Sequence, residues 1–157
     1  MTVGHSKIIE PPTTSSHPNI IAEVRALGAV SYNLLLPETK AIPQVLRPDE
    51  KLLGLVYGRY HEERNNTVSR GVLLATDQRV ILLNKKPMYM KHDEISYKVV
   101  SGVSYTKVAF MGTVTLHSRI GDISIRTFNQ RCARLFVKAI EQKVFTPESV
   151  NNQNYDN

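Results

Sequence analysis

The chain has 157 residues, of which 41% are hydrophobic, and this size and composition predict one folded domain with tails rather than a disordered protein. Its apolar runs are far shorter than the roughly 20 residues of a membrane-spanning helix, and its single cysteine, Cys132, excludes an intramolecular disulfide or a cysteine-rich metal site. The formal net charge is +6, and residues 51–145 carry sixteen Lys and Arg against seven Asp and Glu. A basic folded part attracts anionic membranes, nucleic acids or acidic proteins, unless its charges only keep the surface soluble.

The residues before the strand-rich part divide into two segments by composition. Residues 1–18 lack the apolar core of a secretory signal and are rich in Pro, Ser and Thr, which predicts a flexible tail on a cytoplasmic protein. Residues 19–45 are predicted to form a helical extension. Apolar residues recur there at helical spacing, at Ile20, Ile21, Val24 and Leu27. This stripe is expected to pack on the chain's own domain, with a neighbouring chain as the alternative.

A second helical stretch is expected later in the extension, over residues 38–45. Pro37 suits the first position of a helix, because the N–H that proline lacks has no partner there in any case. Pro43 is expected to interrupt any longer helix.

From Lys51 onward, short apolar segments alternate with turns. The clearest pair is Gly71–Ala75 and Arg79–Leu83, which predicts two buried strands joined by the turn Thr76-Asp77-Gln78. In this turn the Asp77 side chain is expected to accept a hydrogen bond from its own backbone two residues on. Five further strands are expected, over residues 51–60, 89–97, 99–107, 112–118 and 123–128.

One helix is predicted to close the folded part. Asn129 is a suitable N-cap, because its side chain accepts a hydrogen bond from an unpaired backbone N–H. The apolar stripe that follows contains Cys132, Leu135, Phe136, Ala139, Ile140 and Val144. Because Cys132 lies in this stripe, we expect an inert core thiol rather than a nucleophile. Residues 146–157 are predicted to be a disordered tail.

The order and spacing of these segments resemble a known family. The stretches that carry the resemblance are GVLLATDQRVILLNKK, DEISYKVVSGVSY and GTVTLHSRIGDISIRT, followed by the closing helix. They are similar to the bacterial YokE-type pleckstrin-homology-like (PH-like) domain family, over roughly residues 46–144, and the domain is expected to span residues 46–145. The resemblance implies a mainly β fold, a seven-stranded, bent antiparallel barrel closed by one C-terminal α-helix, here preceded by the helical extension. It implies a binding module without enzyme activity or cofactor, with Phe136 in place of the tryptophan of many PH domains.

The resemblance also implies a basic rim at the open end of the barrel. Related domains that bind inositol phosphates use Lys and Arg from the first hairpin and from the turn after the third strand. The matching residues here are Arg59, Arg64, Arg70, Lys85, Lys86 and Lys91. Glu62 and Glu63 lie in the same loop and would repel a phosphate, so a specific phosphoinositide site is disfavoured relative to weak attraction to anionic lipid.

We therefore predict a non-catalytic binding or scaffold protein that acts through protein–protein contacts. Self-association is one form of such contact, because the strands at Val68–Leu74 and Tyr97–Tyr105 could pair at a sheet edge. Peripheral binding to anionic phospholipid at the inner face of the membrane is the alternative. Non-specific nucleic-acid binding is a weaker one, because no nucleic-acid recognition motif is present. His92 and Glu94 could converge on one strand face, but no metal site is expected.

Overall fold

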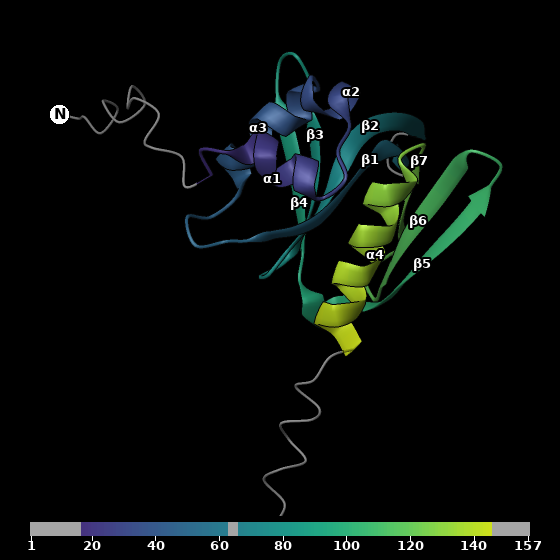
Figure 1. The fold of residues 1–157 in the computed structure, drawn as a ribbon. Coiled ribbons are helices and arrows are strands. Elements are labelled where there is room, and N and C mark those ends of the chain that lie inside the picture. Colours follow the sequence, from purple (N-terminus) through teal and green to yellow (C-terminus); the bar gives the residue numbers. More distant parts are fainter. Residues whose placement is uncertain (1–16, 63–65, 146–157) are drawn as a thin grey trace, which may run out of the picture.

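The computed structural model describes residues 17–62 and 66–145, so most of the first predicted tail and all of the second lie outside the described residues. Three short helices come first and are followed by seven strands and a long helix (Figure 1). The elements are α1 (Ile20–Ala26), α2 (Ser31–Leu34), α3 (Pro37–Val45), β1 (Leu52–Glu62), β2 (Thr67–Thr76), β3 (Val80–Lys85), β4 (Met90–Ile95), the 3-10 helix η2 (Tyr97–Val99), β5 (Val100–Val108), β6 (Met111–Ser118), β7 (Ile123–Thr127) and α4 (Gln130–Phe145).

The seven strands form one antiparallel sheet in the order β4-β3-β2-β1-β7-β6-β5. The long first strand pairs with β2 along its length and with β7 near its end, so it joins the two halves of the sheet. Within the described residues, β4 and β5 lie at the two ends of this order and do not pair with each other. Helix α4 packs on β1 and β5 and fills the space between the halves (Figure 1). The predicted seven-stranded antiparallel fold with a closing helix is confirmed.

A first apolar core lies between the inner face of the sheet and α4. Phe136 is completely buried there, together with Leu73, Val114 and Ile125 from three different strands. Along β6, buried Val114 and Leu116 alternate with half-buried Thr113 and Thr115, as a strand with one inward face requires. At the start of α4, the Asn129 Oδ1 atom accepts a hydrogen bond from the Cys132 N–H at 3.1 Å, which confirms the predicted N-cap.

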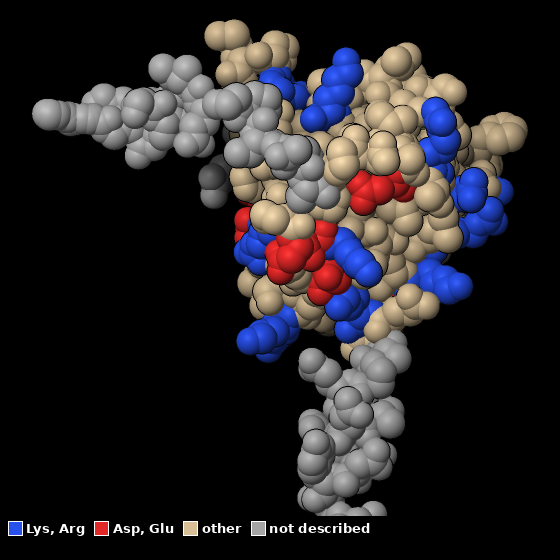
Figure 2. Space-filling view, turned by 60° about the vertical axis from the view of Figure 1, so that its left-hand side comes forward, with Lys and Arg blue, Asp and Glu red and all other residues tan. Residues whose placement is uncertain are grey.

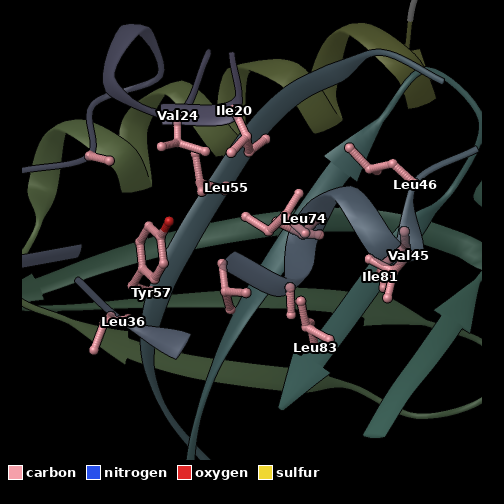
Figure 3. Packing of buried hydrophobic residues seen from close by; sticks show 14 of the residues in the cluster. Ile20, Val24, Leu36, Val45, Leu46, Leu55, Tyr57, Leu74, Ile81 and Leu83 are labelled. Atoms are coloured by element: carbon pink, nitrogen blue, oxygen red, sulfur yellow. The ribbon is translucent and has the colours of Figure 1, made fainter. Parts of the chain in front are cut away.

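A second apolar core lies on the outer face of β1, β2 and β3, beneath the N-terminal helices (Figure 3). Val24 is completely buried and packs in the same cluster as Leu55 and Leu74. The stripe of α1 therefore lies on the chain's own domain, which was the favoured of the two alternatives. Because both faces of β1–β3 are covered, these strands are apolar on both faces. Full burial of each large aliphatic side chain contributes about 1.5–3 kcal/mol to folding.

A buried ion pair between Glu50 and Arg79 connects the end of the helical extension to the hairpin of β2 and β3. Glu50 is only 1% exposed, and both of its carboxylate oxygens accept hydrogen bonds from Arg79, from Nε to Oε2 and from Nη2 to Oε1, each at 3.0 Å. Nη2 of Arg79 also donates to the carbonyl oxygen of Val45 at 2.8 Å, at the end of α3. A second carboxylate, that of Glu94 on β4, accepts from Nη1 of Arg79. One guanidinium group thus links α3, β3 and β4.

One local prediction was wrong, and one was confirmed. The turn between β2 and β3 is held by Thr76, whose Oγ1 accepts hydrogen bonds from the N–H groups of Gln78 and Arg79 at 3.1 and 3.0 Å. The Asp77 side chain instead accepts from the Lys51 N–H at 2.9 Å, across to the start of β1. The helix predicted over residues 38–45 is confirmed as α3, which extends only two residues past Pro43. Pro43 has no N–H to donate to the carbonyl of Thr39, one turn earlier, and the helix ends soon after it.

Candidate functional site

The candidate site is a groove of about 810 Å³ on the outer face of the sheet. Its floor comes from β1, β2 and β7, one wall comes from α2, and the other comes from the connection between β7 and α4. A volume of this size lies within the range of small-ligand sites, roughly 300–1,000 Å³. We call it the arginine groove, after Arg59, Arg70 and Arg126, which line it.

These three arginines lie in one row across the sheet. Arg59 on β1 is directly opposite Arg70 on β2 and also directly opposite Arg126 on β7. Directly opposed residues of antiparallel strands project from the same face, so all three side chains project from the outer face. Tyr57, two residues before Arg59 on β1, projects from the same face and is buried under the N-terminal helices. The row of arginines begins where these helices no longer cover the sheet.

The groove concentrates positive charge. All three arginines are exposed, and the lining of the groove contains no Asp or Glu among the described residues. Like charges at directly opposed strand positions destabilise a sheet. In the part of the chain that the structure describes, no ion pair joins any of these guanidinium groups to a carboxylate. A bound anion would therefore relieve repulsion as well as gain hydrogen bonds, and each guanidinium can bind a carboxylate or phosphate through two N–H groups.

The amino-terminal end of α4 adds to the positive electrostatic potential of the groove. Gln130, the first residue of the 16-residue helix, lines the groove. The unpaired N–H groups at a helix start act as roughly half a positive charge. Asn129 also joins the two walls, because its Nδ2 donates to the Gly28 carbonyl, just before α2, at 2.9 Å and to Asn33 Oδ1 on α2 at 3.2 Å. The position of α2 relative to the arginines is therefore fixed by hydrogen bonds.

Below the groove, a buried hydroxyl pair supports the same wall. The Thr39 hydroxyl donates to the Asn33 carbonyl at 2.6 Å and accepts from the Tyr57 hydroxyl at 2.7 Å. Burial raises the pKa of Tyr57 to about 12, although the bond to Thr39 acts in the opposite direction. Tyr57 therefore stays protonated and is a neutral donor to Thr39.

Comparison with protein families identifies the strand-rich part. The family model described as "Bacterial PH domain" matches residues 46–142, which is more than half of the chain. The chain belongs to the bacterial PH domain family. This confirms the resemblance seen in the sequence, and PH domain families are generally non-catalytic binding modules. The matched residues begin after α3, so one wall of the arginine groove comes from the PH domain and the other from the helical extension.

Solved structures with a similar fold share little sequence with this bacterial PH domain protein. The C-terminal domain of an unknown protein from Leishmania infantum is 16% identical, with a TM-score of 0.49 and coverage of 68% of this chain and 94% of that one. The Vps36 N-terminal PH domain is 18% identical, with a TM-score of 0.47 and coverage of 69% and 86%. A DUF1696 family protein with a pleckstrin-homology domain from Shewanella loihica PV-4 is 13% identical, with a TM-score of 0.41 and coverage of 67% and 91%. No curated protein sequence matches the chain.

The predicted basic rim separates into two places in the structure. Arg59 and Arg70 lie in the arginine groove, whereas Lys85, Lys86 and Lys91 lie around the turn between β3 and β4. Lys85 Nζ donates to the Lys86 carbonyl at 2.9 Å, and Lys91 Nζ is 4.0 Å from Asp93. Arg64 lies outside the described residues. Figure 2 shows Lys and Arg spread over one face of the molecule around smaller groups of Asp and Glu, so basic charge alone does not define a site.

Arg126 was not predicted as a site residue. It follows Arg70 by more than fifty positions, and only the pairing of β1 with β7 brings it beside Arg59. The alternation of β7 does contain a signal, because Ile125 and Thr127 are buried and Arg126 between them is exposed. That signal places Arg126 on the outer face but does not identify its neighbours.

Other side chains that could act in catalysis or metal binding lie outside the arginine groove. Cys132 is completely buried, and burial raises the pKa of its thiol to about 12, so the thiol is an inert part of the core. Nε2 of His92 is 3.9 Å from Glu94, as the strand pattern predicted, but no group of three metal-ligating side chains occurs among the described residues. Within the same described residues, no helix is long and apolar enough to cross a bilayer.

A hydrogen-bonded chain on β5, β6 and the following turn has the order of a catalytic triad. Nε2 of His117 lies 3.0 Å from Ser104 Oγ, and its Nδ1 lies 3.0 Å from Asp122 Oδ2. The bonds from His117 and the Ser118 N–H lower the pKa of Asp122. These side chains are open to water, and the arginine groove does not include them. Acyl transfer needs a preorganised, water-excluding site around the nucleophile, so we assign this chain to strand pairing.

Proposed function

We propose that this bacterial PH domain protein is a non-catalytic binding module that recognises an anionic group of a partner protein in the arginine groove. The observation that carries the proposal is the row formed by Arg59, Arg70 and Arg126, opposed across three strands and without acidic partners among the described residues. Arginine clusters of this kind are a recurring means of recognising acidic and phosphorylated segments. The wall from α2 makes the helical extension part of the binding module.

Substitution of the middle arginine is expected to weaken anion binding. Arg59→Gln keeps a polar side chain but removes the guanidinium that lies between the other two. Charge-assisted hydrogen bonds contribute about 1.5–3 kcal/mol, so the dissociation constant for pyrophosphate should rise about tenfold. The measurement is a titration of each protein with pyrophosphate, followed through the backbone amide signals of the groove in NMR spectra.

Arg134→Gln is the matched control for this experiment. Arg134 is exposed on α4 and does not line the groove, so the substitution removes the same charge from a different place. Its dissociation constant should stay within about twofold of the wild-type value, since distant exposed charges are largely screened by salt. If Arg59→Gln and Arg134→Gln weaken binding equally, the arginines act only through net charge and the proposal fails.

A second candidate is contact with an anionic membrane through the turn between β3 and β4. At this turn Met88 is 91% exposed and Tyr89 is 60% exposed, and Lys85, Lys86 and Lys91 flank them. Each lysine near an anionic surface contributes about 1 kcal/mol. Lys85→Glu combined with Lys86→Glu should therefore abolish sedimentation with vesicles of phosphatidylglycerol and phosphatidylcholine, while Lys107→Glu with Arg134→Glu should retain most of it. Absence of sedimentation of the wild type at low salt would end this candidate.

A further inference from the structure

We infer that the occupant of the arginine groove is an extended acidic segment of a partner protein, with two carboxylates three residues apart and apolar side chains between them. This inference rests on the proposed function and specifies the chemistry of the partner. Three features of the groove carry it: the spacing of the arginines, the apolar walls and the recessed position of the floor.

The spacing of the row matches an extended chain that crosses the strands. Neighbouring strands lie about 4.8 Å apart, so the backbones at Arg70 and Arg126, two intervals apart, are separated by about 10 Å. A peptide in the extended polyproline II conformation has three residues per turn and advances about 3.1 Å per residue, so carboxylates three residues apart project from the same side and are separated by about 9 Å. Each of the two carboxylates can then accept a bidentate pair of hydrogen bonds, one from Arg70 and the other from Arg126. Arg59 then lies between them and can bond either carboxylate or the peptide backbone.

The walls of the groove favour a ligand that has apolar parts. On the side of α2, Val30 is 54% exposed and Tyr32 is 59% exposed. On the connection between β7 and α4, Phe128 is 73% exposed, and on β2, two residues before Arg70, Val68 is 54% exposed. A free phosphate or sulfate would contact the guanidinium groups but leave these side chains in water. A peptide with leucine or phenylalanine between its acids would cover them, and burial of tyrosine and phenylalanine is a main source of affinity at protein interfaces.

The recessed position of the row distinguishes a peptide from a membrane surface. Arg59, Arg70 and Arg126 lie on the floor of the groove, and α2 and the β7–α4 connection line the same groove with apolar side chains. A bilayer is broad and flat, so it is contacted by protruding residues, such as Met88 at the turn between β3 and β4. An extended chain is about as wide as one strand interval and can enter the groove.

The test is fluorescence anisotropy with fluorescein-labelled peptides. The probe is Gly-Glu-Leu-Phe-Glu-Gly. One control peptide has both glutamates replaced by glutamine, and the other has both apolar residues replaced by glycine. The wild-type protein should bind the probe at least tenfold more tightly than either control peptide. Arg126→Gln and Phe128→Ala should each weaken binding about tenfold or more, because each removes one of the two classes of contact. Arg134→Gln should leave the affinity within about twofold.

Each alternative occupant gives a different result in the same experiment. If the peptide without apolar residues binds as tightly as the probe, the walls are not used and the peptide inference is overturned, although the arginine site stands. The inference is also overturned if vesicles of phosphatidylglycerol or a six-nucleotide single strand of DNA bind in an Arg126-dependent way while none of the peptides does. If neither pyrophosphate nor any peptide binds, the proposed function fails together with the inference.

Discussion

Replacement of Arg79 by methionine should lower the free energy of unfolding by about 3–5 kcal/mol, the usual cost of leaving one member of a buried ion pair without its partner. Glu50 is 1% exposed and would keep hydrogen bonds only from Thr76 and from the backbone N–H of Arg47. The Val45 carbonyl at the end of α3 would lose its bond to Arg79 as well. The measurement is urea unfolding at neutral pH, with the free energy extrapolated to water.

The double variant Arg79→Met with Glu50→Gln is the control for this prediction. It removes the charge that Arg79→Met leaves buried, so it should recover part of the lost free energy. If Arg79→Met costs less than about 1 kcal/mol, the ion pair does not hold the helical extension on the domain. In that case, the position of α2 comes from the apolar core and from the Asn129 hydrogen bonds to Gly28 and Asn33.

The pH dependence of unfolding provides an independent check on Glu50. Burial alone would raise the pKa of this carboxyl, but hydrogen bonds from Arg79, the Arg47 N–H and Thr76 hold its pKa below the ordinary value. A group with a lowered native pKa contributes stability above its unfolded pKa, here roughly 4.5, and that contribution is lost as the pH falls further toward the native pKa. The difference in unfolding free energy between wild type and Glu50→Gln should therefore be constant near pH 7 and shrink below about pH 4.5. A difference that grows on acidification would contradict this assignment.

Substitution of Gly58 by alanine is expected to have the second large effect. A Cβ atom at Gly58 would lie 1.9 Å from the carbonyl oxygen of Arg126 and 3.0 Å from Cγ1 of Ile125. Backbone atoms cannot yield as a flexible side chain can, so β1 and β7 would have to separate where they pair. Overpacking costs typically about 1–3 kcal/mol, and a clash with backbone atoms places the cost here near about 3 kcal/mol. The melting temperature should fall by about 10 °C, as measured by circular dichroism.

Gly102→Ala is the matched control for the substitution of Gly58. A Cβ atom at Gly102 would meet only Cζ of Phe145, at 3.9 Å, so the unfolding free energy should change by less than about 1 kcal/mol. Because Arg59 and Arg126 face each other next to Gly58, any folded Gly58→Ala protein should also bind pyrophosphate more weakly. A variant with wild-type stability would show that the close approach of β1 and β7 is not maintained in solution.

The positions of the strands along the chain and of the closing helix could be predicted from the sequence, because each depends on local signals. Ile125 and Thr127 alternate with exposed neighbours, and Asn129 stands immediately before an apolar stripe of helical period. The apolar run that contains Leu73 and Leu74 predicted a buried strand, and both residues are completely buried, one on each face of the sheet. The sequence predicted that the helical extension packs on the domain, but not that it forms a second core over the outer face of the sheet.

The arginine groove was only half predictable. Arg59 and Arg70 were found because they flank one hairpin and because related domains use basic residues there. The third member of the row, Arg126, depends on a pairing between strands distant in sequence, and the wall from α2 depends on the hydrogen bonds of Asn129 to Gly28 and Asn33. Such contacts are set by the folded topology, which local patterns of hydrophobicity do not contain. Lys85, Lys86 and Lys91 were grouped with these residues by sequence, but they do not line the groove.

The central claim is that Arg59, Arg70 and Arg126 form one anion site. The measurement that tests it most directly is an NMR spectrum of the arginine side-chain Nε–Hε groups during titration with pyrophosphate. The signals of these three residues should shift together and saturate with a single dissociation constant, while Arg119, Arg131 and Arg134 shift little. Equal and unsaturable shifts of all arginine signals would mean that pyrophosphate only screens the charged surface, and would contradict the claim.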